Sequence, residues 1–195
     1  MENIVKEPAP KYNYISPDEY LAMERLSDQK HEYYDGNIMA MSGARLKHNQ
    51  MAGNLVLEIG SFLKGKECQV IPSDMRVSTP DRDAYVYPDA TIVCGEPKLE
   101  DDHFDTLLNP TVVFDIWSPS TQKKDVGYKT LYYQNIPSLR EFIMIDSAKR
   151  FARTVRKQTD GIWEFEDITE STDGIFIQSI NFRISFDNIY RNTGL

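Results

Sequence analysis

Spacing of apolar residues predicts three elements in the first third of the chain. Residues 16–26 begin with Ser-Pro-Asp-Glu, the signature of a capped helix with proline in its first turn. Residues 31–41 carry Asp35-Gly36 between two strand-like runs, which predicts a β-hairpin. In residues 46–64 apolar side chains recur at spacings of three and four, which predicts an amphipathic helix.

The remainder of the chain is predicted to be rich in strands, with one further helix. Continuous apolar runs at 111–117 and 141–145 are typical of buried central strands, and a predicted helix over 125–134 would link them as a βαβ crossover. Polar turns separate the other predicted strands. These are 68–71, 75–78, 90–94, a hairpin over 152–168 and one or two last strands within 175–186.

Length and order of elements favour a single α/β domain. The chain has 195 residues, and domains average about 150 residues. Residues 1–13 contain Pro8 and Pro10 with little apolar content, so we predict a flexible N-terminal lead-in. Residues 14–195 are predicted to form one domain with a mixed central sheet flanked by helices and an additional C-terminal hairpin region.

Composition excludes several classes of protein. An apolar fraction of 41% is too high for a disordered chain, and no apolar run approaches the roughly 18 residues of a membrane span. The first residues lack the pattern of a signal peptide, so a cytoplasmic protein is expected. Cys68 and Cys94 are widely spaced and are interpreted as two reduced thiols on strands. A net charge of −8 argues against broad electrostatic capture of nucleic acid.

Candidate chemistry comes from two carboxylates in apolar surroundings. Asp89 precedes an apolar run, and Asp115 interrupts one. A buried ionised carboxylate is costly unless it is paired, hydrogen-bonded or bound to a metal. Two converging carboxylates would suit Mg²⁺ or Mn²⁺, with Glu32 as a third oxygen ligand. Lys129 could place a positive charge beside a phosphoryl group.

Each of these residues also has an ordinary structural interpretation. Buried aspartates often cap turns or pair with arginine, and Pro-Asp pairs commonly begin turns. Lys129 alone is typical of a solvated helix surface, and His48 alone is typical of a first helical turn. Spacing therefore leaves the metal site and the structural interpretation both open.

Several short motifs, taken in order, resemble the Uma-two family over about residues 14–190. That family is placed in the PD-(D/E)XK, or restriction-endonuclease-like, superfamily. The resemblance implies a mixed sheet flanked by helices and Mg²⁺-dependent cleavage of phosphodiester bonds. The motifs are Glu32-Tyr33-Tyr34-Asp35-Gly36, His48, Tyr87-Pro88-Asp89, Asn109-Pro110, Ser118-Pro119-Ser120-Thr121, Asp125 with Lys129 and Tyr133, and Ile136-Pro137-Ser138-Leu139.

Functional roles carried over from the resemblance fall on four residues. Asp89 matches the Asp of the PD element, Asp115 matches the second acid, and Glu32 matches an upstream acid. The superfamily lysine normally lies two residues after the second acid, where this chain has Trp117; Lys129 matches the family's downstream lysine. The family usually has Glu-Val-Leu-Ser where this chain has Asp, Ile, Trp and Ser at 115–118, so the acid is one methylene shorter.

Two functional hypotheses follow from these observations. The first is a nuclease, with DNA as the expected substrate, in which Glu32, Asp89 and Asp115 hold Mg²⁺ or Mn²⁺ and Lys129 helps to activate water. The alternative is a catalytically inactive module that keeps the nuclease fold and binds a partner. A carboxylate-pair glycosidase is disfavoured by the accompanying lysine. By analogy with the superfamily, a homodimer is also expected.

Overall fold

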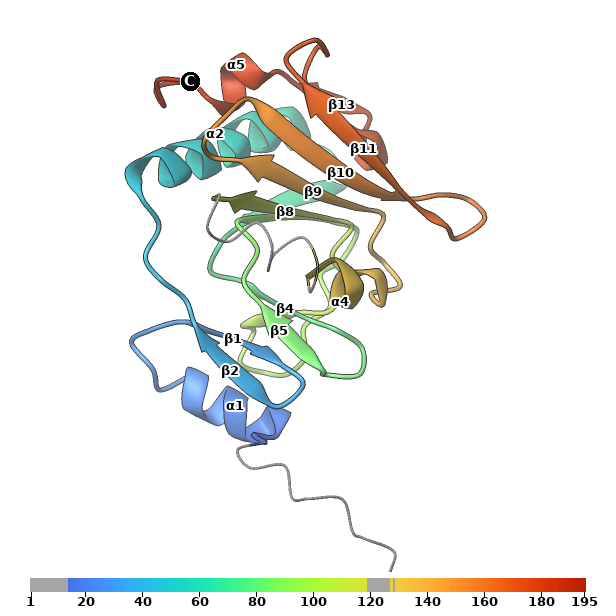
Figure 1. Cartoon of the computed structure of the whole chain (residues 1–195). Coiled ribbons are helices and arrows are strands. Elements are labelled where there is room, and N and C mark those ends of the chain that lie inside the picture. Colours follow the sequence, from blue (N-terminus) through green and yellow to red (C-terminus); the bar gives the residue numbers. More distant parts are fainter. Residues whose placement is uncertain (1–13, 119–126, 128) are drawn as a thin grey trace, which may run out of the picture.

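The computed structural model describes residues 14–118, 127 and 129–195 and contains two large sheets (Figure 1). The predicted lead-in at 1–13 and the first part of the helix predicted at 125–134 lie outside the described residues. The larger sheet has six strands in the order β11-β10-β9-β8-β6-β3. Its strands are β3 (Cys68–Pro72), β6 (Ala90–Cys94), β8 (Val112–Trp117), β9 (Glu141–Asp146), β10 (Phe151–Lys157) and β11 (Trp163–Thr169).

Strand directions in this sheet are mixed. β8 and β9 run parallel, with α4 (Thr130–Gln134) between them in the chain, which confirms the predicted βαβ crossover. The other neighbours pair antiparallel, so the predicted hairpin over 152–168 adds β10 and β11 to the sheet. The sheet is therefore mixed and flanked by helices, as the sequence predicted.

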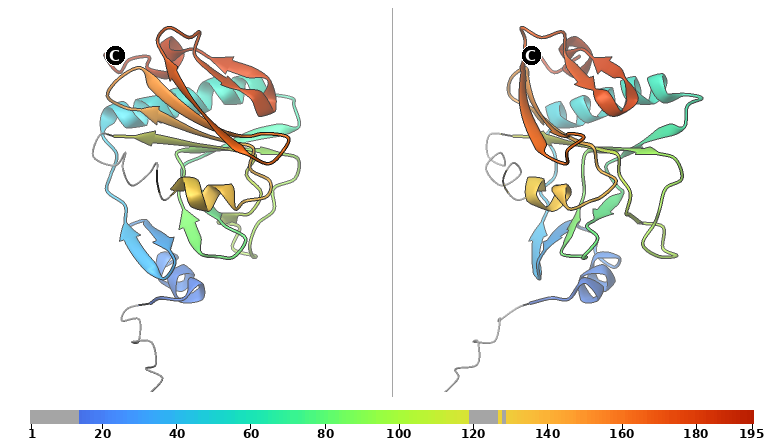
Figure 2. Two further views of the ribbon diagram at one scale, coloured as in Figure 1. Left: turned by 45° about the vertical axis from the view of Figure 1, so that its right-hand side comes forward. Right: turned by 90° about the vertical axis from the view of Figure 1, so that its right-hand side faces the viewer.

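Two apolar layers cover the two faces of the six-stranded sheet. On one face, α2 (Leu46–Leu63) and α5 (Phe186–Ile189) pack over Phe114, Ile143 and their neighbours. The same layer includes the small two-stranded sheet of β12 (Ile175–Ile177) and β13 (Phe182–Ile184), next to the short helix η2 (Gln178–Ile180). On the opposite face of the sheet lies α4 (Figure 2). It packs through Tyr133 against Phe142.

A second sheet of five strands lies beyond α4 and was not predicted as a separate unit (Figures 1 and 2). It includes two very short strands that the apolar pattern did not reveal, β5 and β7. Three tyrosines, Tyr20, Tyr33 and Tyr85, form its aromatic core under α1 (Pro17–Glu24). Its strands are β1 (His31–Tyr34), β2 (Asn37–Ala40), β4 (Arg76–Ser78), β5 (Ala84–Val86) and β7 (Thr106–Leu107).

Local signals account well for the N-terminal elements. Ser16 and Glu19 form a reciprocal capping box at the start of α1. Asp35 and Gly36 both adopt positive φ in the turn between β1 and β2, as an Asp-Gly hairpin requires.

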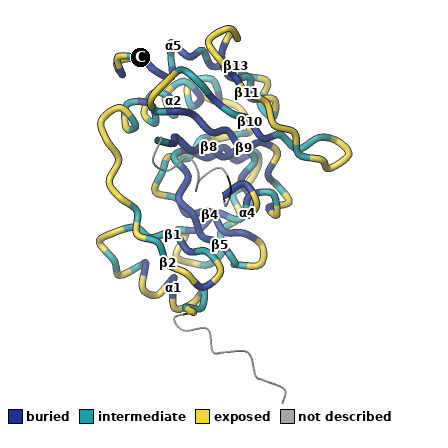
Figure 3. The backbone as a smooth tube through the Cα atoms, in the orientation of Figure 1, coloured by how far each residue is buried: buried dark blue, intermediate teal, exposed yellow. Residues whose placement is uncertain are grey.

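Figure 3 shows the strands around β8 and β9 as the most buried part of the molecule. No helix in the described ranges is long and apolar enough to cross a membrane.

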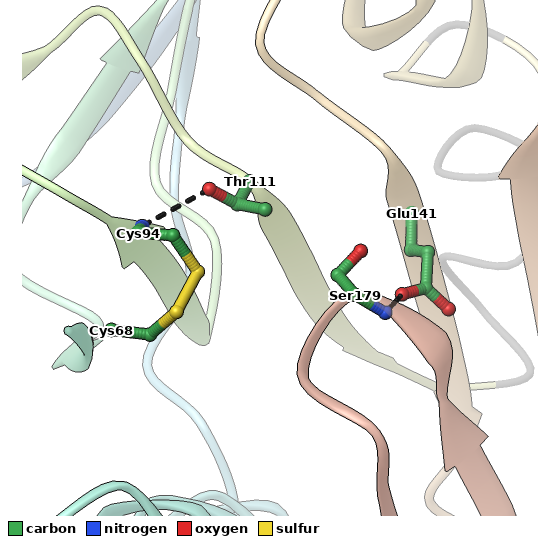
Figure 4. The surroundings of a disulfide bond; sticks show 5 residues. All are labelled: Cys68, Cys94, Thr111, Glu141 and Ser179. Carbon is green, nitrogen blue, oxygen red and sulfur yellow. Dashed lines mark hydrogen bonds between the residues drawn. A yellow bond between two sulfur atoms is a disulfide. The ribbon is translucent and has the colours of Figure 1, made fainter. Parts of the chain in front are cut away.

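The prediction of two reduced thiols was wrong. Cys68 and Cys94 form a disulfide between β3 and β6 (Figure 4). The two cysteines are direct partners in the antiparallel register, and the Cα atoms are 4.0 Å apart. Directly opposed positions on antiparallel strands bring Cβ atoms close together. The linear spacing could not reveal this register, which only strand pairing creates.

Candidate active site

Asp115 lies on the face of the six-stranded sheet that α4 covers. Along β8, Phe114 and Ile116 pack into the layer under α2, whereas Val113 and Trp117 pack into the layer under α4. Alternation along a strand places Asp115 with Val113 and Trp117. Asp115 is 4% exposed, so its carboxylate is taken out of water in the centre of the molecule.

Asp89 is held beside Asp115 by the pairing of β6 with β8. The Asp89 N–H donates to the carbonyl of Phe114 at 2.9 Å. The Ile116 N–H in turn donates to Asp89 Oδ2 at 2.6 Å. These bonds tie the Asp89 carboxylate to the β8 backbone on either side of Asp115. The structure thus brings the two predicted acids together at one point of the sheet.

Lys129 joins Asp115 to Glu32. It directly precedes α4, and its Nζ lies 3.3 Å from Asp115 Oδ2 and 3.0 Å from Glu32 Oε1. Glu32 comes from β1 of the five-stranded sheet, so this ion pair connects the two sheets. Burial alone would lower the pKa of Lys129, but the charges of Asp115 and Glu32 raise it well above its ordinary value. Lys129 is therefore a buried ammonium ion and not the solvated helix residue that its position alone suggests.

Two further residues orient the acids. His48, in the first turn of α2, places Nε2 3.2 Å from Asp89 Oδ2. Burial lowers the pKa of His48, but its hydrogen bond to Asp89 and the charges of Asp89 and Asp115 outweigh burial and raise it. Tyr34 donates its hydroxyl to Glu32 Oε2 at 2.9 Å. Sequence reasoning gave neither residue a role, although both lie in motifs of the family resemblance.

Three buried polar atoms around these acids lack a hydrogen-bond partner within the described part of the chain. They are the Tyr133 hydroxyl, Trp117 Nε1 and His48 Nδ1. Buried polar groups are nearly always satisfied, and exceptions concentrate where a water, ion or ligand binds. The surroundings of Asp115 are therefore equipped to hydrogen-bond something besides the protein itself.

The donor set is of a kind that suits a hard divalent cation. Asp89, Asp115 and Glu32 offer only carboxylate oxygens, which Mg²⁺ and Mn²⁺ prefer. Across residues 14–118, 127 and 129–195, no three His, Cys, Asp or Glu side chains are grouped closely enough to hold a metal. Lys129 instead lies against both Glu32 and Asp115. Of the three predicted ligands, Asp89 contacts His48 rather than Lys129.

The model of a family described as "Putative restriction endonuclease", Uma2, matches residues 17–185. The chain belongs to the Uma2 family. The match spans both sheets and every residue of the candidate site, so the Uma-two resemblance drawn from the short motifs is confirmed. All described helices and strands of the site lie within the matched residues.

Relatives and a solved structure agree with this membership. The Uma2 protein is 29% identical over 188 residues to the uncharacterized protein slr1290 of Synechocystis sp., covering 96% of this chain and 97% of that relative. It is 31% identical over 149 residues to sll1609 of the same organism, covering 76% and 84%. The crystal structure of a putative nuclease belonging to DUF820, from Anabaena variabilis, superposes on this chain with a TM-score of 0.73 at 19% identity. The superposition covers 90% of this chain and 97% of that one. At that identity the likeness shows a shared nuclease-like fold.

Proposed function

We propose that this Uma2 protein is a metal-dependent nuclease that hydrolyses phosphodiester bonds, with DNA as the expected substrate. The observation that carries the proposal is the contact set at Asp115: Asp89 is tied to the same strand, and Lys129 Nζ lies 3.3 Å away. Two adjacent carboxylates and an ammonium ion are the charges that phosphodiester hydrolysis uses. Membership of a family described as "Putative restriction endonuclease" supports the same reaction.

Asp89 and Asp115 would hold Mg²⁺ or Mn²⁺, with Glu32 as a further ligand. When bound, such an ion polarises the phosphoryl group and lowers the pKa of a coordinated water. His48 and the Ile116 N–H fix the Asp89 carboxylate in place by hydrogen bonding. Lys129 supplies a fixed positive charge beside the position at which negative charge develops on the phosphate.

A cleavage assay tests this proposal directly. Purified protein is incubated with single-stranded and double-stranded DNA and RNA, in the presence of Mg²⁺, Mn²⁺ or EDTA. We expect cleavage that depends on the metal and that falls below detection in Asp89→Asn and Lys129→Met. Asp74→Asn is the matched control, since Asp74 is an exposed acid whose ion-pair partner is Lys30. Equal cleavage by Asp89→Asn and the wild type refutes the assignment.

A non-catalytic binding module is the second candidate. The observation in its favour is that Lys129 already forms ion pairs with both Glu32 and Asp115, and that the described residues group no three metal ligands. A metal that binds the folded state stabilises it by mass action. Thermal unfolding with increasing Mn²⁺ separates the two candidates: the nuclease gains stability in the wild type but less in Asp89→Asn, whereas the inactive module shows no difference between them.

A further inference from the structure

The Tyr133 hydroxyl is a buried donor with no assigned role. Tyr133 lies on α4 one turn after Lys129, so both side chains emerge on the same side of the helix. Its ring packs edge-on against Phe142 with the ring centres 4.7 Å apart, and the residue is 1% exposed. No other group in the described part of the chain hydrogen-bonds its hydroxyl. Burying a hydroxyl without a partner is unfavourable for folding, so stability alone does not explain a tyrosine here.

The hydroxyl lies in the electrostatic field of the candidate site. Burial raises the pKa of Tyr133 well above its usual range, Asp115 raises it further, and Lys129 opposes this. Tyr34 and Glu32 add smaller effects of the same sign as Asp115. The phenol therefore stays protonated and acts as a hydrogen-bond donor close to Asp115 and Lys129.

Lys129 and Tyr34 already lie against the neighbouring carboxylates. Lys129 contacts Glu32 Oε1 and Asp115 Oδ2, and Tyr34 donates to Glu32 Oε2. An ammonium group has three N–H donors, of which these contacts use two. Tyr133 and Lys129 thus present donors from the same side of α4, an arrangement that favours an anionic oxygen over another protein carboxylate.

We infer that the Tyr133 hydroxyl donates a hydrogen bond to a non-bridging oxygen of the phosphodiester bound beside Lys129, which makes Tyr133 a further catalytic residue. The inference rests on the proposed nuclease function and adds a substrate contact to it. A hydrogen bond to an oxygen that gains negative charge in the transition state is stronger there than in the bound substrate. Tyr133 should accordingly affect kcat more than KM.

Tyr190 provides a matched control for loss of a hydroxyl. Its ring is equally buried, but its hydroxyl lies 2.6 Å from the carbonyl of Asp146 and 2.8 Å from that of Lys149. Removing this hydroxyl leaves buried carbonyl groups without their donor and should lower stability. The residue packs in the layer under α2, away from Lys129.

The experiment compares Tyr133→Phe with Tyr190→Phe in urea unfolding and in steady-state cleavage. For Tyr133→Phe we expect an unchanged or higher denaturation midpoint, a kcat lower by about 10²-fold and a KM within about threefold of the wild type. For Tyr190→Phe we expect a lower midpoint and wild-type kcat for the folded protein.

Either of two results for Tyr133→Phe overturns the inference while the nuclease proposal stands. One is a wild-type kcat, and the other is a fall in the denaturation midpoint as large as that of Tyr190→Phe, which would show a structural hydrogen bond. Absence of cleavage by the wild type itself is a different result: it refutes the proposed function, and this inference with it.

Discussion

The two faces of the six-stranded sheet each bury a carboxylate, but they treat it differently. On the face under α2, Glu141 is 1% exposed and accepts hydrogen bonds from Arg156, from the N–H of Gln178 and from the N–H of Ser179 (Figure 4). On the face under α4, Asp115 is 4% exposed and lies against Lys129, which it shares with Glu32.

Neighbouring hydroxyl groups differ in the same way. The Tyr190 hydroxyl, under α2, lies within hydrogen-bond distance of three backbone carbonyls. The Tyr133 hydroxyl, which α4 itself carries, has no partner within the described residues. Burial of a polar side chain therefore does not by itself mark a site. In the described part of the chain, hydrogen-bonding capacity that the protein leaves unused also occurs on the face under α2, at the hydroxyl of Thr154, which pairs with Ile143. It marks a candidate site only where it lies beside buried charges, as it does around Asp115.

The largest effect on stability is expected at Glu141. Removing one partner of a buried ion pair leaves the other charge without compensation, so Glu141→Ala should lower the free energy of unfolding by about 4 kcal/mol. Glu166 contacts the same Arg156 at 3.2 Å but is exposed, and Glu166→Ala should change stability by less than about 0.5 kcal/mol. Urea unfolding measures both. A Glu141→Ala protein that is fully folded but has lost cleavage would contradict the claim that Glu141 is structural and that the active site lies on the face under α4.

Reduction of the disulfide should have the next largest effect. Cys68 and Cys94 belong to the layer under α2 and close a loop with a sequence separation of 26 residues. Opening a loop of this length should lower the free energy of unfolding by about 3 kcal/mol. Unfolding is measured with and without dithiothreitol, and a Cys68→Ser, Cys94→Ser double variant should not respond to the reductant. Cleavage by the folded protein should be unchanged, and its loss on reduction would contradict the structural role.

The smallest effect is expected from the ion pairs of the five-stranded sheet, and it depends on pH. Burial alone would raise the pKa of Asp105, but Arg25 and Arg76 together hold it well below its usual range. A lowered pKa contributes stability above the unfolded value of about 4, and this contribution is lost as pH falls through the folded value. Because these side chains are partly exposed, the contribution of Arg25 should be below about 1 kcal/mol.

Unfolding of the wild type and Arg25→Met at pH 6 and at the lowest pH at which both proteins still fold checks this sign. The wild type should be the more stable of the two at pH 6, and the difference should shrink progressively on acidification. A difference that grows on acidification would mean that Asp105 is not held ionised by Arg25.

Sequence reasoning predicted the elements whose signals are local. The capping box at Ser16, the Asp-Gly hairpin and the parallel pair β8 and β9 are all present. The separate five-stranded sheet was missed because β7 has only two residues and because the sheet depends on β5 pairing with both β1 and β4, which are far apart in the sequence. The disulfide was missed because it depends on the register between β3 and β6.

At the candidate site, the sequence identified the charged residues but not their partners. Asp89, Asp115, Glu32 and Lys129 were singled out from apolar context and family resemblance, and the structure brings them together. The contact of His48 with Asp89 and the unpartnered hydroxyl of Tyr133 depend on how α2 and α4 pack on the sheet. Such long-range packing leaves no signal in residue spacing.

The dependence of the cleavage rate on Mn²⁺ concentration, compared between the wild type and Asp115→Asn, tests the central claim most directly. If the face under α4 is a metal-dependent active site, the wild-type rate rises with Mn²⁺ and saturates, while Asp115→Asn stays at the background rate at every concentration. If the Asp115→Asn variant cleaves with the same dependence on Mn²⁺ as the wild type, the claim that this carboxylate is part of the site is contradicted.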